Sequence, residues 1–254
     1  MRNSTPRPGK SGRPAKRAAP RGRPPRKAGS SYHHGDLRHA MLVAAGALIE
    51  EEGVDGLSLR ECARRAGVSH GAPAHHFGDV RGLLTALAAQ SFEMLVTYMD
   101  RYEAAAAPDA FAQLIANGQA YVAFALAHPG RFRLMFRSEW VDRDDAALRA
   151  AGGAAYGRLQ RHIAAVGAAA GADAPGQDAK AAFAWAIVHG LASLALDSQL
   201  CGPDAAHRAP QAARLMQAFS TFMRPGIEGR AAVGSKLVDA RTRRTSRTTS
   251  PRNN

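Results

Sequence analysis

Apolar residues recur at helical spacing along most of the chain. Before Gly53 they return every three or four positions, as one face of a helix requires: Met41, Ala44, Ala45, Leu48 and Ile49. Gly53 follows three consecutive glutamates and is a stop signal for this helix. No segment shows a competing strand pattern. The spacing predicts an all-α protein with a first helix over about 36–53.

A second, short helix is predicted next. Ser58 and Glu61 form the S-x-x-E pattern of a capping box. The helix should occupy about two turns over 59–67, with Cys62 and Ala63 facing inward and a glycine as its stop.

A third short helix should follow directly. Ser69 is its candidate N-cap, and the helix should run to about His76, where Phe77 anchors it. Pro73 removes one backbone donor, which costs little near a helix start and stiffens the segment. Two short helices joined by the Gly-Val-Ser turn, after a first helix, have the size of a helix-turn-helix.

The later helices are mostly longer and are separated by Pro or Gly signals. We expect them over 80–105, 110–127, 131–136, about 144–170, 179–200 and 210–223. The chain then holds about nine helices in two units, at 35–82 and 83–223, between end segments at 1–34 and 224–254.

The net charge of +13 is concentrated in these end segments. Residues 1–34 carry ten Lys/Arg and no acidic residue, and residues 224–254 carry eight Lys/Arg against two acidic residues. The remainder holds sixteen basic and nineteen acidic residues. Two basic arms on a nearly neutral body favour binding to a polyanion such as DNA. We expect both arms, 1–34 and 224–254, to be disordered, and the alternative is that they only solubilise the protein.

Residues 20–24, Pro-Arg-Gly-Arg-Pro, resemble an AT-hook. In that motif two arginines, here Arg21 and Arg23, enter the narrow minor groove of A/T-rich DNA. Such a short motif arises easily in an Arg/Pro-rich tail, so a non-specific polyanion-binding arm is the alternative. Residues 35–82 contain five Lys/Arg against seven Asp/Glu, so the arm would add the cationic charge that this unit lacks.

Cysteine usage and hydropathy point to the cytoplasm. Cys62 and Cys201 lie far apart without metal-ligand spacing, so neither a disulfide framework nor a zinc site is expected. The N-terminus lacks the apolar core of a signal peptide, and the most apolar run, 181–196, is too short for a membrane span. We expect a cytoplasmic protein with no membrane segment, metal or cofactor.

Residues 57–72, Leu-Ser-Leu-Arg-Glu-Cys-Ala-Arg-Arg-Ala-Gly-Val-Ser-His-Gly-Ala, followed by His76-Phe77, resemble the TetR-type transcriptional repressor family. The spacing from capping box to Gly-Val-Ser to His-Phe is more specific than any single motif. Trp185 with Val188-His189-Gly190 is similar to a subgroup named for a C-terminal Trp-His-Gly motif. The resemblance implies a DNA-binding domain at 35–82 and a ligand-binding and dimerisation domain at 83–223.

By position, the resemblance assigns contacts with base edges and phosphates to Ser69, His70, Gly71, Ala72 and His75. It assigns phosphate contacts to Ser58 and Arg60. The chain departs from the family at Ala74, where Tyr is frequent, and at Val80, where Lys is common. Arg81 is the candidate replacement for that Lys.

The paired histidines leave alternatives open. His75 and His76 are either DNA contacts or a packing pair, and packing is favoured for His76. Metal binding would need further ligands from elsewhere, because neighbouring helical side chains diverge by about 100°.

In the family, the later helices enclose a mostly apolar ligand cavity. Most aromatic residues in this region must simply be core. The candidates that face a ligand are Tyr98, Tyr121, Phe124, Phe136 and Trp140, with Gln119, His128 or His189 as polar orienting groups. The resemblance implies an apolar or aromatic small-molecule effector.

The segment 179–200 is apolar on nearly all sides and needs cover on several faces. The candidate dimer-interface residues are Phe183, Ile187, Leu191 and Leu194, together with Leu215, Phe219 and Phe222 from the next helix. A four-helix homodimer interface would place two recognition helices on one palindrome. The alternative is that these helices form the core of a monomer.

The sequence therefore predicts a transcriptional regulator that binds double-stranded DNA. The family favours a repressor that binds a palindromic operator as a homodimer and is released by an effector through a population shift. Activation within the same fold remains an alternative, as does an architectural DNA-binding protein that uses its basic arms. No G-x-S-x-G, phosphate-loop or HExxH motif supports an enzyme, and no catalytic residue is assigned.

Overall fold

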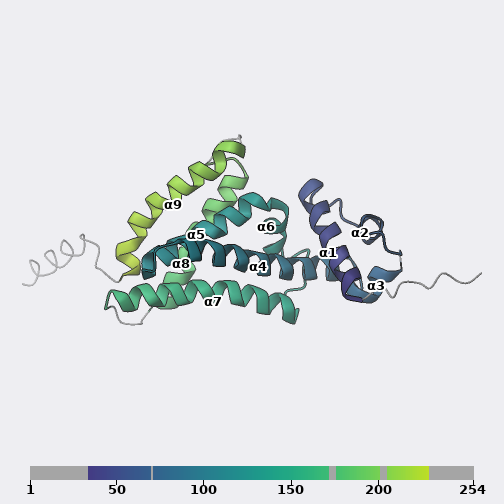
Figure 1. Cartoon of the computed structure of the whole chain (residues 1–254), viewed down its shortest axis with the longest axis horizontal. Coiled ribbons are helices and arrows are strands. Elements are labelled where there is room, and N and C mark those ends of the chain that lie inside the picture. The colour runs from purple at the N-terminus through teal and green to yellow at the C-terminus, as the bar shows by residue number, and fades with distance from the viewer. Residues whose placement is uncertain (1–33, 70, 172–175, 201–204, 229–254) are drawn as a thin grey trace, which may run out of the picture. The chain divides into compact units, whose positions relative to one another are not determined.

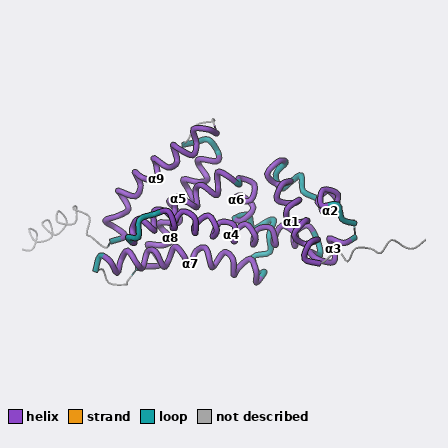
Figure 2. The backbone as a smooth tube through the Cα atoms, viewed as in Figure 1, coloured by secondary structure: helices purple, strands orange, loops and turns teal. Residues whose placement is uncertain are grey.

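A computed structural model describes residues 34–69, 71–171, 176–200 and 205–228 of the chain. These residues form nine α-helices joined by loops, and none of them lies in a strand (Figures 1 and 2). The helices are α1 (His34–Glu51), α2 (Leu59–Ala66), α3 (Ala72–Phe77), α4 (Val80–Ala105), α5 (Ala110–Ala127), α6 (Pro129–Met135), α7 (Ala146–Ala169), α8 (Gln177–Leu196) and α9 (Ala205–Ile227). The predicted all-α fold with about nine helices is confirmed.

Aspartate caps explain where the longer helices begin. The Asp79 carboxylate accepts a hydrogen bond from the Gly82 N–H at 2.8 Å, and Asp109 accepts one from Ala112 at 3.0 Å. Each carboxylate satisfies a backbone donor that the first turn leaves without a partner. Helices α4 and α5 accordingly have the bounds that the sequence predicts.

Helix α3 starts later and helix α8 ends earlier than the sequence predicts. Helix α3 begins at Ala72 and is capped by Gly71, so Ser69 is not its N-cap. Pro73 lies in the first turn, where its missing N–H has no intrahelical partner to lose. Helix α8 ends at Leu196, four residues early, ahead of Ser198 with its φ of 58°.

Helix α9 is longer than the predicted 210–223. It contains Pro210 and Pro225 within its span. The predicted helix is too short at both ends because the sequence rule treats proline as a helix boundary.

Three apolar clusters hold the helices together. The first joins α1 and α2 to α4, to α6 and to the segment that begins α7: Met41, Leu48, Ile49, Cys62, Ala63, Leu83, Leu87, Leu134, Val141 and Leu148. The second packs α4, α5, α6, α8 and α9 around Phe124 and Phe132. The third packs α5, α7, α8 and α9 around Leu114 and Ile163. Helix α4 enters the first two clusters, so it links the N-terminal helices directly to the later ones.

Helices α5 and α8 are long and apolar enough to cross a membrane by length and composition alone. Helix α8 has 20 residues, so the expectation that this run is too short was wrong. Both helices pack against several others, and the buried half of α5 includes Leu114, Tyr121 and Phe124. Core packing therefore explains the apolar composition of α5 without a membrane.

Candidate DNA-reading head and ligand cavity

Helix α2 is fixed at both ends by the residues that the sequence indicates. The Ser58 hydroxyl accepts a hydrogen bond from the Glu61 N–H at 3.2 Å. Gly67 ends the helix with a φ of +67°, a conformation that glycine adopts without a Cβ penalty. Cys62 and Ala63 are fully buried as predicted, and burial raises the pKa of the Cys62 thiol to about 11. The thiol therefore stays protonated and serves as packing.

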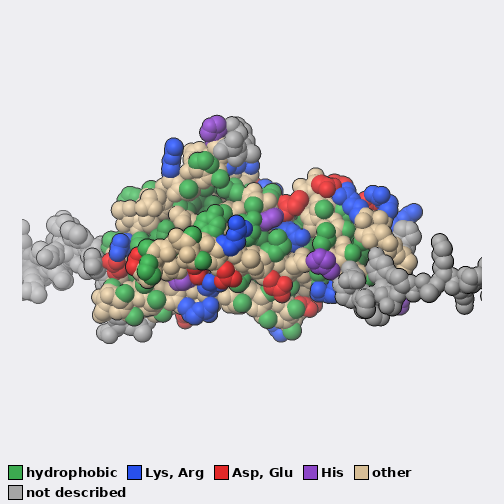
Figure 3. All heavy atoms as spheres, viewed as in Figure 1, with side chains coloured by type: hydrophobic (Ala, Val, Ile, Leu, Met, Phe, Trp, Pro, Cys, Tyr) green, Lys and Arg blue, Asp and Glu red, His purple; other side chains and the backbone are tan. Residues whose placement is uncertain are grey.

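The arginines of α2 are bound by acidic residues of α1 and α2. The Glu61 carboxylate accepts from Arg64 at 2.6 Å and from Arg65 at 3.1 Å. Arg65 also donates to Glu51 at 2.5 Å and to Glu52 at 2.9 Å. The Arg64 and Arg65 guanidiniums lower the pKa of Glu61 to about 2. Acidic and basic side chains consequently lie side by side over α1 and α2 (Figure 3).

Helix α3 exposes small side chains and one imidazole. Gly71, Ala74 and His75 are exposed, whereas Pro73 is buried. His76 is half-buried, with its ring centroid 6.4 Å from that of Phe77. The structure thus supports packing for His76 and leaves His75 accessible.

The other predicted DNA contacts fall into two groups. Ser58, Arg60 and Ser69 are exposed around α2 and α3, so they stay predictions. Three others, Arg21, Arg23 and His70, lie outside the described residues, as does the side chain of Ala72.

Arg81 contacts the loop before α7. Its guanidinium Nη2 donates to the Val141 carbonyl at 3.0 Å. Thr85, one turn later, accepts a hydrogen bond from the Asp142 N–H at 2.9 Å. Arg81 therefore joins the start of α4 to the loop before α7, and its contact with DNA stays a prediction.

Among the described residues, no group of three or more His, Cys, Asp or Glu side chains has the arrangement of a metal site.

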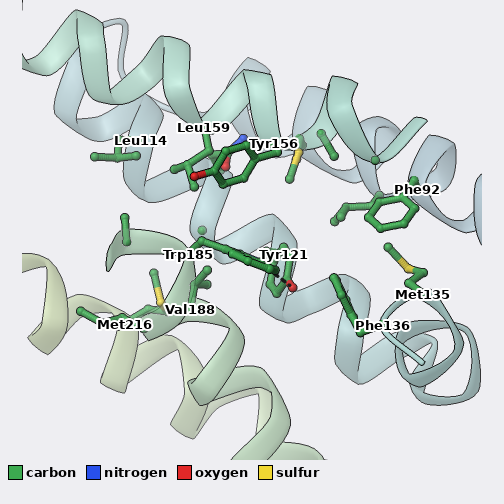
Figure 4. Close-up of a pocket in the computed structure, with 18 of the residues that line it drawn as sticks. Phe92, Leu114, Tyr121, Met135, Phe136, Tyr156, Leu159, Trp185, Val188 and Met216 are labelled. Carbon is green, nitrogen blue, oxygen red and sulfur yellow. Dashed lines mark hydrogen bonds between the residues drawn. The ribbon is translucent and has the colours of Figure 1, made fainter. Parts of the chain in front are cut away.

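A cavity of about 370 Å³ lies between α4, α5, α7, α8 and α9 (Figure 4). Its lining includes Phe92, Leu114, Tyr121, Met135, Phe136, Tyr156, Leu159, Trp185, Val188 and Met216. A cavity of this size and apolar character matches the ordinary range of small-molecule sites.

Two of the five predicted ligand contacts line this cavity. Tyr121 and Phe136 do so, whereas Tyr98, Phe124 and Trp140 do not. The Tyr98 hydroxyl lies 3.1 Å from His128 Nε2, and its ring packs edge-on against Phe124. The Arg137 guanidinium carbon lies over the Trp140 ring, 5.4 Å from the ring centroid. These three aromatic side chains serve packing in this structure.

Trp185 and Tyr156 line the cavity although sequence reasoning did not assign them to it. The Trp185 Nε1–H donates to the Tyr121 hydroxyl at 3.3 Å (Figure 4), and that hydroxyl lies 2.8 Å from His189 Nδ1. Burial raises the pKa of Tyr121 and lowers that of His189, so both groups favour their neutral forms. The Trp-His-Gly motif was the available signal, because it places Trp185 and His189 one turn apart.

Helix α6 connects the cavity wall to α1. At its start, the Glu50 carboxylate of α1 accepts hydrogen bonds from the N–H groups of Gly130 at 2.8 Å and Arg131 at 3.1 Å. A Cβ on Gly130 would lie 2.4 Å from the Ile49 carbonyl oxygen, so only glycine permits this approach. At its end, Met135 and the following Phe136 line the cavity.

The Arg131 side chain strengthens this junction. Its guanidinium donates to the Gln90 side-chain oxygen Oε1 at 3.2 Å and to the Ser91 hydroxyl at 3.3 Å, both on α4. A Cβ on Gly46 of α1 would collide with that guanidinium. Sequence reasoning missed the junction; its only local signals were glycines at 46 and 130 inside helical segments.

The predicted dimer-interface residues lie in three environments. Phe183, Leu194 and Phe222 have exposed fractions of 61%, 43% and 81%. Leu215 and Phe219 are half-buried against the core, and Ile187 is half-buried in the cavity lining. Leu191 is only 2% exposed, so it belongs to the core of the protomer and its assignment to the interface was wrong.

Two family models match the chain. The model described as "Bacterial regulatory proteins, tetR family" matches residues 41–87, and the one described as "Tetracyclin repressor-like, C-terminal domain" matches residues 114–219. The chain belongs to the TetR family of bacterial regulatory proteins. It is accordingly a transcriptional regulator with an N-terminal helix-turn-helix, and the two matches cover α1 into α4 and most of α5 through α9.

Solved structures share the fold of this chain. A Rhodococcus sp. RHA1 protein of unknown function is 36% identical over 78% of this chain and 98% of its own, with a TM-score of 0.66. The TetR-family regulator PfmR from Thermus thermophilus is 15% identical over 73% of this chain and 94% of its own, with a TM-score of 0.55. RolR in complex with resorcinol is 18% identical over 78% of this chain and 95% of its own, with a TM-score of 0.51. No curated protein matches the chain.

Proposed function

We propose that this TetR-family regulator is a cytoplasmic repressor that binds a palindromic operator as a homodimer and is released by a small-molecule effector. The observation that carries the proposal is helix α6, which lines the cavity at one end and is held by Glu50 of α1 at the other. The alternative of an architectural protein that binds DNA through its arms gives no role to such a cavity.

DNA reading is assigned to α3 and the start of α2. The exposed face of α3 carries only small side chains and His75, so its backbone can approach the major groove closely. Ser58 and Arg60 at the start of α2 would contact phosphates. Because Arg64 and Arg65 are bound by glutamates, the basic segment before α1 would add most of the phosphate charge.

Dimerisation is assigned to the exposed faces of α8 and α9. Phe183 and Leu194 on α8 and Phe222 on α9 expose apolar side chains that a second copy would cover. An isologous two-fold contact through these helices would present two copies of α3 to the two half-sites of a palindrome.

Effector release is assigned to the junction between α6 and α1. A ligand that displaces Phe136 or Met135 would move α6, and Glu50 would transmit that movement to α1. DNA affinity would then fall by the factor by which the ligand favours the displaced conformation. RolR binds resorcinol within the same fold, which supports a small effector here. The mechanism needs no reaction on the ligand, so we assign no enzymatic activity.

The test uses fluorescence anisotropy of an operator obtained by selection from random DNA. Glu50→Gln removes the charge that caps α6, and we expect operator affinity to fall about fivefold or more with the dimer intact. Glu93→Gln is the matched control, since Glu93 is an exposed glutamate of α4. Equal affinity of the Glu50→Gln variant and the wild type, or one chain per operator by mass photometry, would contradict the proposal.

A further inference from the structure

The cavity is an elongated slot along α7. Its α7 wall includes Arg149, Gly152, Tyr156 and Leu159, which lie on one face of the helix. Ten residues of helix correspond to about 15 Å of length. Figure 4 shows Phe92, Met135 and Phe136 at one end of the slot and Leu114 and Met216 at the other.

The slot has charged groups at one end only. Of the described residues that line it, the two with charged side chains are Arg143 and Arg149. Arg143 lies at the Phe136 end, because its Nη2 donates to the Phe136 carbonyl at 3.2 Å. Gly152 faces the Phe92 ring, and Arg149 lies one turn before it, toward the same end.

The acidic residues near these arginines lie outside the slot. Asp144 is 3.8 Å from Arg149, and its side chain is 97% exposed. Glu139 pairs with Arg137 at 3.2 Å. Neither carboxylate lines the cavity. Each guanidinium carries five N–H donors, so both arginines retain donors for a ligand.

Two polar groups along the middle of the slot already have partners. The Asn117 amide donates to Glu103 at 3.0 Å, and the Tyr121 hydroxyl is bonded to Trp185 and His189. The Tyr156 hydroxyl is a further polar group of the lining, but most of the lining is apolar, so the interior favours an apolar ligand body.

We propose that the effector is an elongated apolar carboxylate, with its alkyl or arylalkyl body in the slot and its carboxylate between Arg143 and Arg149. Guanidinium groups suit this anion because they bind carboxylate oxygens through paired N–H donors. The inference rests on the proposed effector-released function and specifies the chemistry of its ligand.

The test compares three ten-carbon probes, decanoate, decan-1-ol and decylamine, below their micelle concentrations. Binding is read from Trp185 emission in a Trp140→Phe background, because Trp185 lines the slot and the chain has two tryptophans. We expect decanoate to bind about tenfold more tightly than decanol, with decylamine weakest.

The double variant Arg143→Gln/Arg149→Gln should lose this tenfold preference while its affinity for decanol stays unchanged. Arg161→Gln, an exposed arginine of α7 that does not line the slot, is the matched control and should retain the preference. Equal binding of decanoate and decanol, a preference that survives the double variant, or no binding of any probe would overturn the inference.

Operator anisotropy with the same probes separates this inference from the proposed function. If decanoate binds with an arginine-dependent preference and the operator stays bound, the site chemistry holds and the effector role fails. If decanol releases the operator as well as decanoate does, the effector role holds and the carboxylate inference is overturned.

Discussion

The DNA-reading head, formed by α1, α2 and α3, and the cavity use arginine in opposite ways. In the head, Arg64 and Arg65 are bound by Glu51, Glu52 and Glu61. At the cavity, Arg143 and Arg149 are the charged residues of an otherwise apolar or neutral lining, within the described part of the chain. Arg64 pairs within α2 and Arg65 ties α2 to the end of α1, whereas the second pair retains donors for a ligand.

The difference implies that one segment recognises the shape of the DNA and another segment supplies the positive charge that binds its phosphates. Residues 35–82 hold fewer basic than acidic residues, and two of the five basic residues are the bound arginines of α2. A helix-turn-helix with so little available positive charge needs cations from another segment to bind phosphates well. The ten Lys/Arg of residues 1–34 are the nearest in sequence.

Removing the charge of this segment should have the largest effect. A chain in which these ten Lys/Arg are Gln keeps its length, and we expect its operator affinity to fall on the order of 100-fold at physiological salt. If about half of the cations contact phosphates, the slope of log affinity against log salt should fall by about 4–5. An unchanged slope would show that the segment only solubilises the protein.

His75→Ala should have the next largest effect on DNA binding. Arg64 and Arg65 of α2 are bound to glutamates. Among the described side chains of α3, the exposed imidazole of His75 is the longest polar one. Its loss should weaken operator binding about tenfold, within the usual range for one base contact. Competition with non-specific DNA is the control: equal loss for both DNAs would mean that His75 contacts phosphate rather than bases.

Ser58→Ala and Ser69→Ala should differ in stability. Ser58 caps α2, so its loss should lower the free energy of unfolding by about 1 kcal/mol, or a few degrees in Tm. Ser69 caps no helix, so Ser69→Ala should leave Tm nearly unchanged. Thermal unfolding of both variants tests this difference. An equal loss of Tm in both variants would mean that Ser69 also caps a helix.

Glu61→Gln should have the smallest effect, and that effect should depend on pH. The pKa of Glu61 is lowered from 4.5 to about 2 in the folded state. Its contribution to stability is therefore present above pH 4.5 and is lost as the pH falls toward 2. The Tm difference between wild type and Glu61→Gln should be small at pH 7, because exposed ion pairs are weak, and should vanish toward pH 2.

The parts of the fold that local chemistry determines were predictable from sequence. The caps Ser58, Asp79 and Asp109 and the left-handed Gly67 each act within one turn, so the bounds of α2, α4 and α5 follow from neighbouring residues. Helix α3 shows the limit of this reasoning. The sequence favours Ser69 as its cap, but the helix starts at Ala72 after Gly71, which places Pro73 in the first turn.

The cavity was less predictable because residues far apart in sequence form it. Tyr121 and Tyr98 both lie on long amphipathic helices, yet only Tyr121 lines the cavity. The difference depends on which face of α4 meets α5 and α7, and helical spacing alone does not set that choice. Leu191 fails as an interface residue for the same reason, since α8 packs that side against the protomer core.

The central claim is that the chain reads an operator as a dimeric TetR-family regulator. Selection of bound sequences from a random DNA pool, with the full chain at near-physiological salt, tests it most directly. The account predicts enrichment of an inverted repeat whose half-sites are separated by about one helical turn of DNA. Retention of DNA without any enriched sequence would contradict it and favour an architectural protein that binds through its basic ends.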